Sequence, residues 1–489
     1  MKVTKILLIF FIVGILGRTS FAQQILTLDD ALRIAMENSP DIKRSMLNLE
    51  RSRQSLKAQQ AALKSRFNLS ITPFDFTRIR QFNSFFNTWN TNDSKSSSGN
   101  LSVTQPIKWT DGTLSLINRF EWQDSYSEFR DERNKTYNNN LYVSYNQPLF
   151  TYNKTRLDLR ELELDFENTY LSYALQKLGL EYQVSLNFYN VYKNKMSYQI
   201  AVEEFHNQEQ SEQIIKNKVD AGLSAKEELY QAELNLATSK STVQNAKVTL
   251  ENSLDEFKRL TGISLMEDID VIADVSHQPV KVDLQKALDT GLDKRMELQQ
   301  RNIDIENSLA NITRTKAYNE FRGDLTLTYG IIGTNEQYEQ IYDDATKNQR
   351  VSLSFEVPLF DWGERKARIK AAEAQLNNQY LTQENQKNNI IIGIRQAIRD
   401  LQNLEIQIEI ARQNVTNAEL TYEIKLEQYK NGDLTSMDLN LYQIQLSDRK
   451  TGLVNALINY KLALLNLKIE SMWDFVKNDP VIPDLQSLD

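Results

Sequence analysis

The hydrophobic pattern changes its period partway through residues 351–376. Over 351–357, apolar and polar residues alternate, which is the two-residue period of a strand with one apolar face. Pro358 ends this pattern because proline has no backbone N–H to donate to a neighbouring strand. After Gly363, charged residues and alanines recur with a helical period. The segment therefore predicts a strand that runs directly into a helix.

The same transition occurs earlier in the chain, so the sequence is built twice. Pro148 and Pro358 are each followed by Leu-Phe, and they lie 358 − 148 = 210 residues apart. Closer to the start of each half the offset is larger: NLSIT at 68–72 matches DLTLT at 324–328, 256 residues later. The first half therefore carries 256 − 210 = 46 extra residues. A period this long indicates a duplicated half and not an array of short repeats.

The 46 extra residues predict an additional β-hairpin with loops, because LSVTQP at 101–106 resembles VSYNQP at 143–148. The expected strands are about 9–11 residues long, which suffices to cross a membrane at a tilt. Aromatic residues cluster near their ends, as in an interfacial belt: Tyr142, Tyr145, Phe150, Tyr152, Tyr329, Tyr338, Tyr342, Phe360 and Trp362. A small soluble sheet with ordinary aromatic packing is the alternative interpretation.

Long heptad-like stripes follow each strand region. Apolar residues recur at three- and four-residue spacing from Ile390 to Tyr429 and from Leu439 to Leu467, and most of these positions are matched 210 residues earlier. A helix over about 155–219 would be on the order of 100 Å long. Such rods pack along one another, so we interpret the stripes as packing surfaces and not as a cofactor site.

These patterns define the expected domains. They comprise a signal peptide (1–22), a first repeat (23–262, with a β-hairpin region at 67–148 and a helical hairpin at 155–262), a linker (263–282), a second repeat (283–472, with a β-hairpin at 323–358 and a helical hairpin at 363–472) and a tail (473–489). Lys2, Lys5, a short apolar core and a small residue at Ala22 predict export with cleavage after Ala22. That core is too short to span a bilayer.

Composition excludes several function classes. The chain has no cysteine and two histidines, which leaves no disulfide and no histidine or thiolate metal site. Its net charge of −8 argues against a nucleic-acid partner. No phosphate-binding loop or hydrolase motif is present, so we expect neither enzyme activity nor a cofactor.

Strand number limits how a membrane sheet could close. An unpaired backbone amide in lipid costs several kcal/mol, so such a sheet cannot leave an open edge. Two to three hairpins supply four to six strands, whereas small bacterial barrels have eight. Several chains must therefore share one barrel, with the helical rods forming a shared tube.

The repeated Pro-Leu-Phe junctions at Pro148 and Pro358, the openings ALRIAMENSPDI and ALDTGLDKRMEL, and the turns AGL and NGDL resemble the TolC-like outer-membrane efflux proteins. The resemblance implies a mainly α fold with a membrane β-barrel, in which long antiparallel coiled-coil helices form an α-barrel. It also implies a homotrimer with a twelve-stranded barrel in outer-membrane lipid, extending into the periplasm of a Gram-negative bacterium. The implied partners are a periplasmic adaptor and an inner-membrane pump of RND or ABC type.

The resemblance further implies which residues lie at the periplasmic end. The turns at Gly222, Leu223 and Gly432 would dock the adaptor. Glu228, Tyr429 and Asp438 match the family's gate, whereas Leu434 and Leu441 replace an arginine and an aspartate of that network. Alternatively, Tyr429 ends the heptad stripe, and Glu228 and Asp438 are ordinary solvated charges.

Two broader interpretations remain open at this point. The channel would be the passive exit duct of a tripartite efflux or type I secretion system, which share one architecture. A secreted or periplasmic coiled-coil scaffold or adhesin would account for the heptads and the signal peptide, although not for strands that lead into long helices twice.

Overall fold

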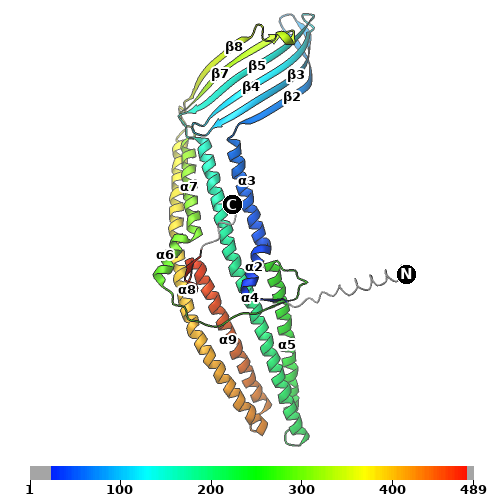
Figure 1. Ribbon diagram of the computed structural model, residues 1–489, viewed down its shortest axis with the longest axis vertical. Coiled ribbons are helices and arrows are strands. Elements are labelled where there is room, and N and C mark those ends of the chain that lie inside the picture. The colour runs from blue at the N-terminus through cyan, green and yellow to red at the C-terminus, as the bar shows by residue number, and fades with distance from the viewer. Residues whose placement is uncertain (1–23, 482–489) are drawn as a thin grey trace, which may run out of the picture. The chain divides into compact units, whose positions relative to one another are not determined.

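The computed structural model describes residues 24–481 and divides into two compact units (Figure 1). The sheet unit comprises Leu49–Tyr170 and Gln300–Gln383, and the helical unit comprises the described residues up to Asn48, Leu171–Gln299 and those from Glu384 onward. Each unit draws on both repeats. The predicted signal peptide, 1–22, and the last eight residues lie outside the described part of the chain.

The sheet unit contains one six-stranded antiparallel sheet with the strand order β2-β3-β4-β5-β7-β8. The strands are β2 (Arg66–Asn83), β3 (Thr88–Ile107), β4 (Gly112–Ser127), β5 (Glu132–Leu149), β7 (Arg322–Asn335) and β8 (Thr346–Glu356), and a short helix η1 (Tyr338–Gln340) lies between the last two. The expected additional hairpin is β3–β4. The twelve-stranded trimeric barrel that the resemblance implies would need four strands from each chain. The sheet has six, so a trimer of this sheet would have eighteen strands.

The sheet unit also holds a layer of four helical segments. They belong to α3 (Pro40–Ala62), α4 (Lys154–Asp220), α7 (Met296–Lys316) and α8 (Glu364–Asn431). Side-chain contacts give their order: Ser52 of α3 bonds to Asp165 of α4 at 3.1 Å, and Arg160 of α4 bonds to Glu306 of α7 at 2.8 Å. Gln383 of α8 completes the layer by bonding to α7.

The two strand-to-helix junctions differ in detail. Pro148 lies inside β5, opposite Asp324, and the turn follows at Phe150 with a positive φ of 61°. In the second repeat β8 ends at Glu356, before Pro358, as the missing N–H of proline predicts. A carboxylate caps each helix start: Asp111 accepts from the N–H groups of Lys154 and Thr155, and Asp361 does so for α8.

The helical unit contains the rest of α4 and α8 together with α2 (Leu28–Asn38), α5 (Lys226–Thr261), α6 (Leu284–Lys294) and α9 (Ser436–Ser471). Two small sheets accompany them: β1 (Gln24–Leu26) pairs in parallel with β6 (Ile269–Val271), and β9 (Trp473–Asp474) pairs with β10 (Asp479–Pro480). The heptad stripe is buried here, with Ile394, Leu401 and Leu467 almost fully enclosed. Among residues 24–481, no helix is both long and apolar enough to cross a bilayer.

Candidate functional sites in the sheet and at the helix turns

The sheet has one apolar and one polar face, because side chains alternate along each strand. One row of residues in register across four strands on the first face is Val103, Leu116, Val143 and Tyr329. The adjacent row, on the second face, is Thr104, Ser115, Ser144, Thr328 and Arg350. The sheet therefore has an apolar face on one side and a polar face on the other.

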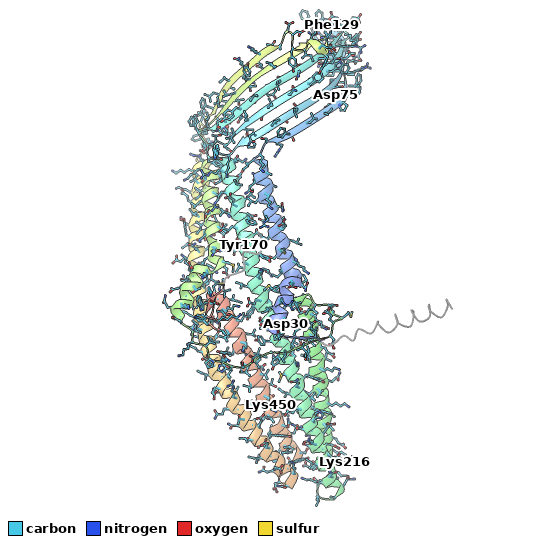
Figure 2. The ribbon with its side chains drawn as sticks, in the orientation of Figure 1. Asp30, Asp75, Phe129, Tyr170, Lys216 and Lys450 are labelled. Atoms are coloured by element: carbon cyan, nitrogen blue, oxygen red, sulfur yellow. The ribbon has the colours of Figure 1, made fainter. Side chains whose placement is uncertain are left out.

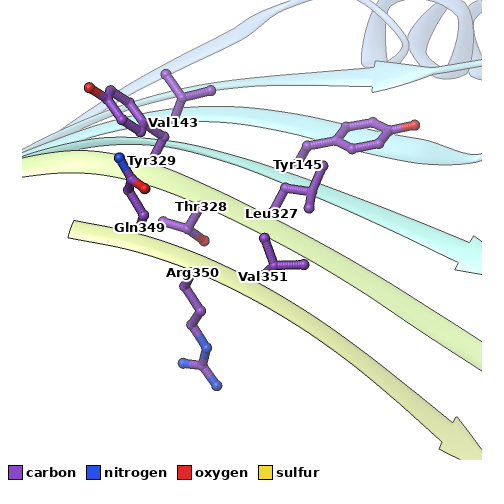
Figure 3. A pocket seen from close by; sticks show the side chains of 8 residues that line it. All are labelled: Val143, Tyr145, Leu327, Thr328, Tyr329, Gln349, Arg350 and Val351. Carbon is purple, nitrogen blue, oxygen red and sulfur yellow. The ribbon is translucent and has the colours of Figure 1, made fainter. Parts of the chain in front are cut away.

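The apolar face is exposed. Val351 is 76% exposed, and Phe67, Leu69 and Leu353 are also largely open to the surroundings. Figure 3 shows this face near β7 and β8, where Arg350 extends away from the apolar side chains of its neighbours. An apolar surface that continues over six strands is far larger than the patches of soluble monomers, and it is typical of contact with lipid.

The apolar band crosses the strands at a slant. In β7 the band runs from Leu325 to Ile331 and is centred on Thr328, whose row reaches Arg66 in β2. In β2 the band runs from Phe67 to Phe76, so its centre is displaced by 71 − 66 = 5 residues. This is about 16 Å along the strand over four interstrand steps of about 4.8 Å, which gives a slant of about 40°. Strands that cross a membrane in barrels are tilted by about this angle.

Charged pairs replace the apolar side chains on this face toward the hairpin ends of β2–β5. Arg78 holds Asp93 through two hydrogen bonds of 2.6 and 2.5 Å, and Arg133 holds Asp124 in the same forked arrangement. Ion pairs of this kind are usually solvated, so they mark where the lipid-facing band ends toward the hairpin turns of β2–β5.

The helical unit ends in two turns of the same geometry. α4 and α8 each end before a glycine with positive φ, Gly222 at 72° and Gly432 at 91°. The N–H of Leu223 donates to the Lys218 carbonyl at 2.8 Å, and Asp433 makes the equivalent bond at 2.9 Å. Both turns are helix C-caps that require the left-handed conformation that glycine adopts without strain. Leu223 is 78% exposed beside the first glycine.

Tyr429 is buried between the two helical hairpins and is only 1% exposed. Its hydroxyl donates to the Ser211 carbonyl of α4 at 3.1 Å, and its own carbonyl accepts from Lys218 Nζ at 2.5 Å. The Lys218 ammonium also lies 5.1 Å from the centre of the Tyr429 ring. Burial raises the pKa of Tyr429 to about 12, so the hydroxyl stays protonated and remains a donor. Tyr429 thus joins α8 to α4.

The two predicted gate carboxylates have different surroundings. Glu228, in the first turn of α5, accepts from the N–H of Ser436 at 3.0 Å and so caps the start of α9. Asp438 is exposed and accepts from the Thr435 hydroxyl at 2.7 Å, while that hydroxyl caps the Asp438 N–H at 3.1 Å. The structure brings Glu228 to the second hairpin but keeps Asp438 in its own turn.

Sequence reasoning missed Lys218, Ser211 and Thr435. The T-x-x-D pattern of Thr435 and Asp438 is a recognisable N-cap signal and could have been found. Lys218 donates to the backbone carbonyl of Tyr429, and Ser211 accepts from the Tyr429 hydroxyl with its own backbone carbonyl. Every residue carries such a carbonyl, so periodicity contains no sign of these contacts. Leu434 packs against the cluster around Tyr429, and Leu441 is exposed.

Further along the same hairpins, α9 is tied to α4 by polar side chains. Lys450 contacts Glu203 at 2.7 Å, and Gln208 donates to Asn440 at 2.7 Å (Figure 2 labels Lys450). Together with Tyr429, these contacts fasten the two hairpins of one chain to each other.

The sequence and the fold are both similar to those of known proteins. Residues 287–469 match the family described as outer membrane efflux protein. The fold is similar to the CmeC outer membrane channel of Campylobacter jejuni (TM-score 0.69, 15% identity, 94% of this chain and 87% of that one). It is also similar to VceC of Vibrio cholerae (0.66, 12%, 91% and 95%) and to the open state of the Neisseria gonorrhoeae MtrE channel (0.64, 14%, 94% and 91%). No curated protein matches the sequence significantly.

Proposed function

We propose that this chain belongs to the outer membrane efflux protein family, whose model matches residues 287–469, and that three copies assemble into the exit duct of a tripartite efflux system. The chain is an outer membrane efflux channel that extends into the periplasm, and its family is one of channels and not of enzymes. A coiled-coil scaffold or adhesin is thereby set aside. In the proposed assembly the duct conducts substrates passively, and the energy comes from an inner-membrane pump.

One observation carries the proposal: the slanted apolar band on an open six-stranded sheet. Its opposite face bears serine, threonine and asparagine, which suit a water-filled lumen. Among the strands formed by residues 24–481, β2 and β8 each have one edge without a neighbour in the sheet. Such edges are tolerated in lipid only when they are paired, so the sheet requires further copies of the chain.

The proposed partners contact the helical unit. We place the adaptor at the turns of Gly222, Leu223 and Gly432, where an exposed leucine offers an apolar contact beside the glycine that ends α4. An inner-membrane pump of RND or ABC type would act through that adaptor. Export would follow cleavage after Ala22, a position outside the described residues.

The proposed gate lies in the same unit. Glu228, Tyr429 and Asp438 would close the periplasmic end, since Tyr429 and Glu228 hold the second hairpin against the first. Releasing these contacts would let the hairpins separate. Asp438 is free to face the axis because its partner, Thr435, belongs to its own turn.

Fractionation and complementation test the proposal together. The full-length chain, expressed in a strain that lacks its own exit duct but retains a matching adaptor and pump, should appear in the outer-membrane fraction. Detergent-extracted protein should have the mass of three chains by light scattering, and drug resistance should return. A monomer in the periplasmic fraction would contradict the proposal.

A further inference from the structure

The hairpin β3–β4 belongs to the sheet wall and is not a surface loop. β3 pairs with β2 from Thr88 to Thr104 and with β4 from Asn92 to Ile107. The division into faces also continues through it: Leu101 and Val103 lie on the apolar face, whereas Ser102 and Thr104 lie on the polar face. Both added strands are therefore built to cross lipid as the original four are.

The added strands also match the sheet to the helices that it adjoins in the sheet unit. Six strands at about 4.8 Å spacing and about 40° tilt cover about 38 Å of circumference. Four helices, α3, α4, α7 and α8, at about 9 Å spacing cover about 36 Å. Four strands would cover only about 25 Å. With β3–β4 included, the sheet and the helical layer therefore cover nearly the same length of circumference.

The outer strands are suited to pair with each other between copies. The meander has an even number of strands, so β2 and β8 run in opposite directions. When β8 of one copy meets β2 of the next, the pattern continues antiparallel. A register in which β2 of the next copy is displaced along β8 by the same step as neighbouring strands within the sheet would continue the slant of the apolar band as well.

We propose that three copies of this chain close an eighteen-stranded barrel, with β2 of each copy paired to β8 of the next. This inference rests on the proposed trimeric duct. The backbone radius of such a barrel is about 18 Å, against about 12 Å for twelve strands of the same tilt. The hairpin β3–β4 thus sets the width of the outer-membrane pore and admits bulkier substrates.

Cysteine crosslinking tests the edge pairing, since the natural chain contains no cysteine. Ser70→Cys on β2 would be combined with Ser352→Cys or Ser354→Cys on β8, all on the polar face. Oxidation in the membrane should give covalent dimers and trimers for at least one pair. The matched control, Ser70→Cys with Ser144→Cys on β5, should stay monomeric because β5 is not an edge strand. A ladder from the control, or none from either test pair, overturns the proposal.

A deletion tests the pore width. Removing Thr88–Asp131 deletes 131 − 88 + 1 = 44 residues, keeps the turn at 84–87 and joins β2 to β5 with both faces preserved. Ser354→Cys would then be labelled with maleimide-polyethylene glycols of increasing mass added outside the cell. The full barrel should admit larger polymers than the deletion variant, and equal cut-offs overturn the proposal.

The outcomes separate this inference from the proposed function. A mass of two chains for the undeleted protein would leave twelve strands and overturn both the trimer and the eighteen-stranded barrel. A trimer in the outer membrane without crosslinks between β2 and β8 would overturn only the barrel. If the deletion variant does not insert, the crosslinks and the mass of the undeleted chain still decide.

Discussion

Single residues at the helix turns connect helices that lie far apart in the sequence. Tyr429 follows the heptad spacing, and its burial was predictable from that pattern. Its hydrogen-bond partner was not, because Ser211 offers a backbone carbonyl 218 residues away. The pairing depends on how two hairpins pack, which is information that the local sequence does not contain.

Replacing Tyr429 with phenylalanine removes one hydroxyl and keeps the packing of the ring. The loss of one buried hydrogen bond should lower the free energy of unfolding by about 1 kcal/mol and weaken the link between the hairpins. We expect higher single-channel conductance in planar bilayers for Tyr429→Phe, and more so when it is combined with Glu228→Ala. Parental conductance in the double variant would place the gate elsewhere.

The same variant has a defined pH dependence. The pKa of Tyr429 is raised to about 12 in the folded chain from an ordinary value of about 10. The protonated form is therefore favoured by folding: its contribution is fully present below pH 10 and is lost as pH rises toward 12. Thermal unfolding in detergent should show a smaller loss of stability over this range for Tyr429→Phe than for the parent.

At the scale of elements, strands and helices were largely predictable, and pairing was not. The change of period located β8 and the start of α8, and internal similarity located the extra hairpin. Proline was a poor guide in β5, where Pro148 is accommodated inside the strand. The sequence left the strand count at four to six, because register and neighbours are set by contacts between distant strands.

The turn between α4 and α5 is the element that we expect to dock the adaptor. Leu223→Glu places a charge at its exposed apolar tip, which should abolish drug resistance while outer-membrane insertion and trimer mass stay unchanged. Met266→Glu is a matched control, since Met266 is 93% exposed in the loop after α5. Full resistance in the Leu223→Glu strain would contradict docking at this turn.

The proposed trimer would repeat the same side chains around one axis. In a trimer, each exposed carboxylate at the helix turns occurs three times, and like charges that face one another attract cations. Sequence matching identified Asp438 for this role, and in the structure its carboxylate accepts from Thr435 of its own turn. The carboxylate is exposed at the turn.

Asp438→Asn removes that charge and retains an oxygen that can accept from Thr435. We expect lower selectivity for cations over anions, measured as a shift of the reversal potential toward zero in a salt gradient across a planar bilayer. Glu267→Gln, in the loop after α5, changes the same net charge away from the turns and should leave the potential unchanged. An unaltered reversal potential for Asp438→Asn would exclude the residue from the conduction path.

The strands of the sheet differ in length, so the rim formed by their hairpin turns is uneven. Asn335, the last residue of β7, pairs with Tyr137, yet the hairpin β4–β5 continues 137 − 132 = 5 residues beyond that point. Viewed from outside the cell, the proposed trimer would have three raised segments of wall, each ending at the turns of Phe86 and Phe129. Three lower segments, above β7 and β8, would separate them. In the proposed trimer, an emerging substrate would leave the barrel most easily above β7 and β8, where the wall is lower.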